Sequence, residues 1–138
     1  IYIAEQWGGR IRRVAANGII TTVASGLSSP YGLAFNPAGV LHVGDTYGGV
    51  VRRVNTDGTL TTVAGVGQRS FSGDGGPALS AGVWPAGIAF DHAGNLYIAD
   101  EDSHRVRMVR AQAPSFTPDA LPAVTVPSGR NDGRSFAS

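Results

Sequence analysis

The chain has 138 residues, enough for one domain or for part of one. Its 11 basic residues, all arginine, nearly balance 10 acidic residues, so no strong electric field favours nucleic acid or an anionic membrane. The absence of cysteine excludes disulfides, thiol catalysis and cysteine-ligated metals, and no apolar run approaches the roughly 20 residues of a membrane-spanning helix.

The sequence repeats itself along its length. Residues 1–24 align without gaps with residues 41–64, and residues 30–54 align with residues 85–109. One unit is therefore about 40 residues long, with a single insertion between Val63 and Pro85. We expect repeats at about 1–29, 30–84 and 85–110, followed at 111–138 by a tail or linker rich in Pro, Ser and Gly.

Each unit divides into short apolar runs that are rich in Val, Ile, Leu, Phe and Tyr, which is typical of β-strands. Asn, Asp and Gly stand between the runs and supply the positive-φ positions that hairpin turns need. No window has the spacing of an amphipathic helix. A unit has four such runs: the last repeat shows the first three as Gly87–Asp91, Leu96–Asp100 and Arg105–Val109, and the middle repeat shows the fourth as Thr59–Ala64.

Four antiparallel strands about every 40 residues are the signature of a β-propeller blade. The sequence therefore predicts an all-β fold with about two and a half four-stranded blades, beginning at the second strand of a blade. In the tail, the run Leu121–Val126 is a candidate for one outer strand of the last blade, at 121–126.

One stretch of the chain also matches a known repeat pattern. Residues 85–109, PAGIAFDHAGNLYIADEDSHRVRMV, resemble the NHL repeat, and TVAGVGQRSFSGDGGPA resembles the linker between NHL blades of bacterial proteins. The resemblance covers about residues 1–110. It implies a propeller, commonly six-bladed, whose edges and loops bind other molecules, and an extracellular or periplasmic location. The chain departs from the pattern where Gly9 and Gly49 replace the histidine that His104 supplies, and where Glu5 replaces aspartate.

An acidic residue closes the second strand of each unit: Glu5, Asp45 and Asp100. A catalytic residue has no reason to recur in every blade, whereas a residue that ties a strand end to the following turn does. Because Arg105 and His104 follow Asp100 closely, we interpret Glu5, Asp45, Asp100 and Arg105 as a structural hydrogen-bond network. The alternative is a metal or acid/base role, since strand ends near a propeller axis can gather the oxygen ligands that Ca²⁺ prefers.

Other motifs favour neither catalysis nor nucleic-acid binding. The chain has no HxH or HExxH spacing, no G-x-S-x-G nucleophile elbow and no P-loop. Third-strand arginines recur at equivalent positions, as Arg12, Arg52 and Arg107 do, which favours a structural role over an RNA-binding stripe. We therefore predict that the chain is not an enzyme, with no catalytic residues, no cofactor, no metal, and neither a nucleic-acid nor a membrane partner.

The variable residues gather on one predicted face. Alternate loops of an antiparallel blade point the same way, so the loops 6–9, 46–49 and 101–104 share a face with the linkers 25–29 and 65–84. Exposed aromatic residues with an arginine nearby suit recognition of a protein or a glycan. The structural alternative is that the aromatic residues only brace the blades and the linker. We predict a binding or scaffold module whose loop-rich face carries Trp7, Tyr47, Arg69, Phe71, Trp84, Asp102 and His104.

Two further expectations concern the whole molecule. The alternative function is a fragment of a propeller hydrolase or lyase with a metal in its central channel. An open arc of blades would leave large apolar faces bare, so we expect further blades of a longer polypeptide, or homo-oligomerisation, to complete the propeller.

Overall fold

The computed structural model describes residues 1–112, and these residues form strands joined by turns, loops and one short 3₁₀ helix. The predicted all-β fold is confirmed. The tail, including the candidate strand at 121–126, lies outside the described residues. The elements are β1 (Tyr2–Glu5), β2 (Arg10–Val14), β3 (Ile20–Ser25), β4 (Pro30–Phe35), β5 (Leu41–Asp45), β6 (Val50–Val54), β7 (Leu60–Ala64), η1 (Ala78–Ser80), β8 (Pro85–Phe90), β9 (Leu96–Asp100) and β10 (Arg105–Val109).

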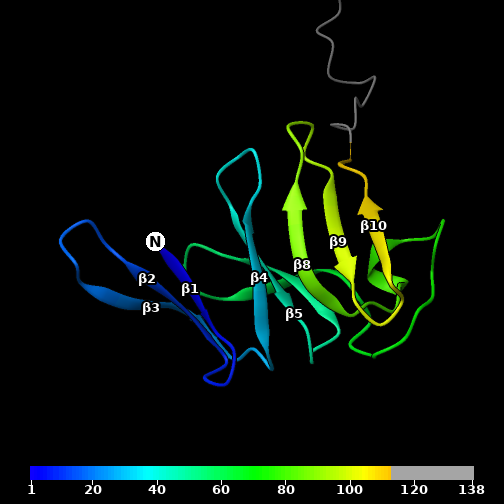
Figure 1. Cartoon of the computed structure of the whole chain (residues 1–138). Helices are drawn as coiled ribbons and strands as arrows, with labels where there is room; N and C mark the ends of the chain where they lie inside the picture. Colours follow the sequence, from blue (N-terminus) through cyan, green and yellow to red (C-terminus); the bar gives the residue numbers. More distant parts are fainter. Residues whose placement is uncertain (113–138) are drawn as a thin grey trace, which may run out of the picture.

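The strands form three antiparallel sheets, each a meander of consecutive hairpins. We call them the first blade (β1-β2-β3), the second blade (β4-β5-β6-β7) and the third blade (β8-β9-β10). Figure 1 shows them following one another in sequence order, from the blue first blade to the yellow and orange third blade. Within residues 1–112 only the second blade has all four strands. The first lacks a counterpart of β4, and the third lacks a counterpart of β7.

The turns at one end of the blades have local causes. In the β6–β7 turn, the amide of Asn55 donates to the Thr59 carbonyl at 2.9 Å, and the amide of Gly58 donates to the Asn55 carbonyl at 3.0 Å. Gly58 has a φ of 83°, in the left-handed region that glycine adopts without a Cβ penalty. The turn sequence Asn-Thr-Asp-Gly is therefore sufficient to form this hairpin turn, without contacts from distant residues.

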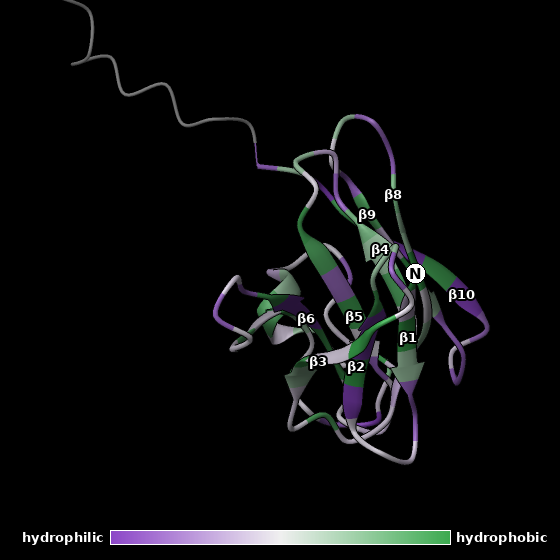
Figure 2. Ribbon diagram, turned by 90° about the vertical axis from the view of Figure 1, so that its left-hand side faces the viewer, coloured by the Kyte–Doolittle hydropathy of each residue, from purple (hydrophilic) through white to green (hydrophobic). Residues whose placement is uncertain are grey.

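The hydrophobic core lies between the blades. We call the side of a blade that faces the next blade in sequence its forward side, and the other its backward side. Figure 2 shows hydrophobic segments mostly on the strands and hydrophilic ones mostly on the loops. Buried forward-side residues pack against buried backward-side residues: Ile11 and Ala24 against Leu41 and Val43, then Val51 and Ala64 against Leu96 and Ile98.

The first strands of neighbouring blades come very close together. A Cβ on Gly32 of β4 would lie 2.9 Å from the amide nitrogen of Ile88 in β8, so only glycine fits there. Such close backbone approach places β4 and β8 on the inner side of the arc, where propeller blades converge. Among the described residues, no helix has the length and apolarity needed to cross a bilayer.

Candidate binding site

The loops between second and third strands lie beside the linkers between blades. The amide of Leu27 donates to the Gly9 carbonyl at 3.0 Å, and the amide of Gly67 donates to the Gly49 carbonyl at 3.3 Å. In the third blade the amide of Glu101 donates to the Trp84 carbonyl at 3.1 Å. These contacts place loops 6–9, 46–49 and 101–104 and the linkers at one end of the sheets, which we call the loop-rich face.

Asp45 and Asp100 hold the linker that precedes their own blade, rather than only the turn that follows. Asp45 is buried, and its Oδ1 accepts from the amides of Ser28 and Ser29 at 3.0 and 2.7 Å. Asp100 is equally buried, and its Oδ1 accepts from the amide of Trp84 at 3.0 Å. A buried carboxylate is stable only with such donors, and the repeated contact supports the structural interpretation.

The expected role of Arg105 in this network differs from the observed one. Arg105 lies opposite Asp100 in the β9–β10 pairing, but its guanidinium carbon stands 4.1 Å from the centre of the Phe71 ring. Arg107, two residues on, reaches Asp100 Oδ2 with its Nη1 at 3.4 Å, and its Nη2 lies 2.7 Å from the carboxylate of Asp74. The reason is the path of the long linker, which brings an aromatic ring to Arg105 and a carboxylate to Arg107.

Glu5 occupies the equivalent position in the first blade and shares one type of partner with Asp100, because Arg12 aligns with Arg107. Its carboxylate accepts from Nε of Arg10 at 2.6 Å and from Nη1 of Arg12 at 3.0 Å. The hydrogen bond from Arg10 and the charges of both arginines hold the pKa of Glu5 below its usual value. Glu5 therefore stays ionised and joins the first two strands of its sheet rather than a linker.

The departure of Gly9 and Gly49 from the histidine pattern has a steric cause. His104 has a φ of 52°, and Gly9 and Gly49 have the same left-handed backbone, with φ of 59° and 60°. A Cβ on Gly49 would lie 2.9 Å from the amide nitrogen of Gln68, and one on Gly9 would collide with the Leu27 carbonyl. The following linker thus excludes a side chain in the first two blades. His104 is exposed, without such a linker against it in the described residues.

A pocket of about 380 Å³ opens on the loop-rich face. The first blade contributes Gln6, and the second contributes Tyr31, Thr46 and Tyr47. The remaining lining comes from the long linker and the third blade: Arg69, Trp84, Ala86, Glu101 and Asp102. Because residues far apart in the sequence line it, the pocket exists only when the three blades are packed together. We call it the loop-face pocket.

Trp84 is the fixed centre of this pocket. Its ring is buried, with the Tyr47 ring edge-on at a centroid distance of 5.1 Å and the Arg69 guanidinium 4.1 Å above it. Arg69 is held in turn by two hydrogen bonds to the carboxylate of Asp102, one of them 2.7 Å long. The bonds from Arg69 lower the pKa of Asp102, so the carboxylate remains charged and the pair intact at neutral pH.

Four of the seven residues predicted for the binding face line the loop-face pocket: Tyr47, Arg69, Trp84 and Asp102. The other three do not. Trp7 is 89% exposed on the loop of the first blade, Phe71 lies under the arginines of β10, and His104 is exposed in the third-blade loop.

Sequence reasoning did not single out Tyr31, Gln6 or Glu101, which also line the pocket. Tyr31 directly follows Pro30 at the loop-side start of β4, where the aligned residue in the third unit is Ala86. An exposed aromatic residue at a position where the other repeat has alanine is the sequence signal that could have identified Tyr31 as a binding residue.

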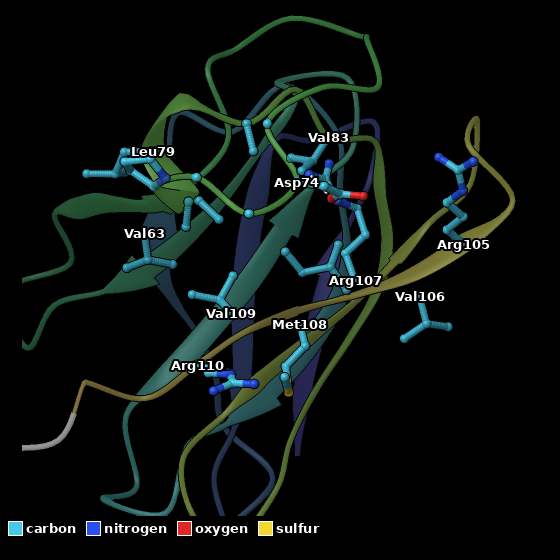
Figure 3. A pocket seen from close by; sticks show the side chains of 18 of the residues that line it. Val63, Asp74, Leu79, Val83, Arg105, Val106, Arg107, Met108, Val109 and Arg110 are labelled. Carbon is cyan, nitrogen blue, oxygen red and sulfur yellow. Dashed lines mark hydrogen bonds and ion pairs between the residues drawn. The ribbon is translucent and has the colours of Figure 1, made fainter.

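A second, larger hollow of about 1110 Å³ lies beside β10, between the third blade, the long linker and the end of β7. Figure 3 shows Leu79 and Val83 of the linker on one side of it and Val109 of β10 on the other. This outer groove occupies the position in which a fourth strand would complete the third blade. Among residues 1–112, no group of three or more histidine, aspartate or glutamate residues is arranged to hold a metal ion.

Comparison with known proteins agrees with this fold. Residues 83–107 match the NHL repeat, and the similar solved structures are β-propellers. A protein of unknown function from Bacteroides thetaiotaomicron superposes with a TM-score of 0.70 at 21% identity, covering 79% of this chain and 32% of that one. No curated protein sequence matches the chain.

Two similar structures belong to proteins with different functions. An auxiliary nutrient binding protein from Bacteroides ovatus gives a TM-score of 0.59 at 22% identity, over 80% of this chain and 35% of that one. Virginiamycin B lyase from Staphylococcus aureus, solved with quinupristin, gives a TM-score of 0.55 at 18% identity, over 82% of this chain and 38% of that one. At these identities the likeness shows the fold alone, and this chain spans about a third of the length of the structures it matches.

Proposed function

We propose that this chain, which carries an NHL repeat and folds as an arc of β-propeller blades, is a binding module that recognises a protein or a glycan through its loop-rich face. One observation carries the proposal. The loop-face pocket collects side chains from all three blades and the long linker around a buried tryptophan, at a volume of about 380 Å³. A concave site lined by aromatic residues with a few convergent polar groups is the usual form of a ligand site.

The pocket walls suit a ligand with both an apolar face and hydroxyl or amide groups. Tyr31 is 61% exposed and Tyr47 is 58% exposed, so both rings are accessible to a partner. Gln6 and Glu101 add hydrogen-bonding groups to the lining. Sugar rings and peptide side chains both combine these features, and aromatic residues contribute strongly to such contacts.

Hydrogen bonds and an ion pair position two linker residues of the pocket. Trp84 is tied through its amide to Asp100, and Arg69 is clamped by Asp102. Because the charge of Arg69 is neutralised by its partner, the guanidinium is positioned without drawing in a free anion. A preorganised site of this kind loses less entropy on binding than a mobile loop would.

The test is a nuclear magnetic resonance titration of the labelled chain with panels of oligosaccharides and short peptides. We expect a binding member of either panel to shift the indole signal of Trp84 and the amides of loop 46–49. Tyr31→Ala and Tyr47→Ala should each weaken that binding about tenfold or more. His92→Ala, in the tight turn at the other end of the third blade, is the matched control and should leave affinity unchanged.

Two outcomes contradict the proposal. Shifts that map to the tight turns near Asn17, Asp57 and His92 would move the site to the opposite face. Binding that survives both tyrosine substitutions would show that the pocket is not where the partner contacts the module.

A further inference from the structure

The loop-face pocket lies where the second and third blades meet. Its lining comes from these two blades and the linker that joins them, apart from Gln6 of the first blade. The pocket is therefore formed inside the described part of the chain and not at either end of it. At about 380 Å³ it lies near the lower limit of ligand sites, which are roughly 300–1,000 Å³, and this size suits a single long side chain.

The lining contains one charge that has no partner, and this charge is negative. Three charged side chains line the pocket: Arg69, Glu101 and Asp102. Arg69 and Asp102 form an ion pair with each other, so their charges cancel. The side chain of Glu101 is exposed and makes no hydrogen bond or ion pair within residues 1–112. The pocket as a whole therefore has an excess of negative charge.

The position of Glu101 is charged in one blade only. Gln6, Thr46 and Glu101 are equivalent residues of the three repeats, each directly after the second strand, and all three line the pocket. The residue before each of them is acidic in every blade and belongs to the structural contacts described above. Because the repeat accepts a neutral side chain where Glu101 stands, the fold does not require this carboxylate, which remains available to a ligand.

Aromatic rings that can face a cation line the same pocket. Tyr31 at the start of β4 and Tyr47 in the loop after β5 are both exposed. The buried ring of Trp84 already has a cation on its face, the guanidinium of Arg69 at 4.1 Å from the ring centre. The face of an aromatic ring attracts a cation through its quadrupole. Tyr31 and Tyr47 therefore offer a partner the interaction that Trp84 makes within the chain.

The charges of the pocket stabilise a cation that is already there. The hydrogen bond that Arg69 donates to Asp102 raises the pKa of Arg69, and the charge of Glu101 raises it further. Glu101 thus acts on a positive group held against Trp84. An anionic ligand would instead be repelled by the excess negative charge, so acidic sugars and acidic peptides do not suit this site.

We propose that the loop-face pocket takes a basic side chain, a lysine or an arginine, of a partner protein. The charge of that side chain pairs with the carboxylate of Glu101, and its aliphatic stem lies against the rings of Tyr31 and Tyr47. This inference rests on the binding function proposed above and selects a protein from its two ligand classes. A neutral sugar would stack on the same rings but leave the charge of Glu101 unpaired in the contact.

The experiment is a nuclear magnetic resonance titration of the complete 138-residue chain with four capped peptides, Gly-Ser-Gly-X-Gly-Ser-Gly, in which X is lysine, arginine, norleucine or glutamate. Norleucine has the stem of lysine without its charge. We expect a basic peptide to shift the indole signal of Trp84 and to bind at least about tenfold more tightly than the norleucine peptide. Added sodium chloride should weaken its binding, because salt screens exposed charges.

Two variants make the result specific to the carboxylate in the pocket. Glu101→Gln keeps the size of the side chain and leaves the main-chain bond from residue 101 to the Trp84 carbonyl in place. It should remove most of the advantage of the basic peptide over the norleucine peptide. Asp57→Asn removes a carboxylate from the tight turn at the opposite face, where the aligned residue is Asn17, and should leave the affinity unchanged. Circular dichroism will verify that both variants fold.

The outcomes distinguish this inference from the function on which it rests. Equal binding of the basic and norleucine peptides, tighter binding of the glutamate peptide, or a preference that survives Glu101→Gln would overturn the assignment of a basic side chain. An oligosaccharide that shifts the indole signal of Trp84 when neither basic peptide does so would also overturn it, while recognition through the loop-rich face would stand. If no peptide and no oligosaccharide shifts that signal, the inference and the binding function both fail.

Discussion

Asp45→Ala tests the structural role of the carboxylates that recur in the blades. The Asp45 side chain is buried and accepts hydrogen bonds from two consecutive main-chain amides, those of Ser28 and Ser29. These bonds fix the short linker to the end of β5. The substitution removes the acceptor and leaves both amides without their partner.

The expected loss follows from the surroundings of the two amides. A buried donor that loses its partner costs about 1–3 kcal/mol. The Ser29 amide is buried and should incur this cost in full, whereas Ser28 is exposed and water can replace part of its bond. We therefore expect Asp45→Ala to lower the free energy of unfolding by about 2–4 kcal/mol, a large part of the roughly 5–15 kcal/mol typical of a domain.

The measurement is urea unfolding followed by tryptophan fluorescence, with the midpoint compared at constant slope. Asp57→Ala is the matched control, because Asp57 also accepts from a main-chain amide, that of Thr59 at 3.0 Å, but in an exposed turn. It should cost less than about 1 kcal/mol. If Asp45→Ala is no more damaging than Asp57→Ala, the carboxylate does not hold the linker and the structural interpretation is refuted.

Three further predictions concern other parts of the chain. Arg69 lowers the pKa of Asp102, so their ion pair should stabilise the linker fully at pH values above the unfolded carboxyl pKa of about 3.9. This stabilisation should be lost as the pH falls through the lower pKa of the folded state, and the indole signal of Trp84 should then shift. Arg69→Met should abolish that shift. Burial lowers the pKa of His42, so the contribution of neutral His42 to the free energy of unfolding should be fully present above the unfolded pKa of about 6.5. It should be lost as the pH drops through the lower pKa of the folded state. His42→Tyr should remove this pH dependence in urea titrations. Gly9→Ala should cost at least about 1 kcal/mol in the same titrations, because φ is 59° and the methyl group would meet the linker carbonyl; an unchanged midpoint would contradict the steric argument.

The amino-acid sequence by itself determined the class of fold and most of the strands. The predicted strands Leu96–Asp100 and Arg105–Val109 have the bounds of β9 and β10, and Thr59–Ala64 differs from β7 by one residue. The predicted strand Gly87–Asp91 is displaced, because β8 begins two residues earlier, at Pro85, and ends one residue earlier, at Phe90. These elements depend on short-range chemistry: alternating branched residues for the strands, and Asn, Asp and Gly for the turns between them. The gapless repeat then indicated that each unit adopts the same sheet.

The partners of the functional and structural side chains were decided only by tertiary structure. Arg105 lies opposite Asp100 in the strand pairing and Arg107 lies two residues farther along, but the folded linker places Phe71 against Arg105, and Arg107 is the arginine that contacts Asp100. Likewise, no local pattern links Tyr31 to the linker residue Trp84, which meet in one pocket. The strands and turns depend on residues a few positions apart in the sequence. The contacts of these side chains depend instead on how whole blades and the linker at residues 65–84 pack against one another.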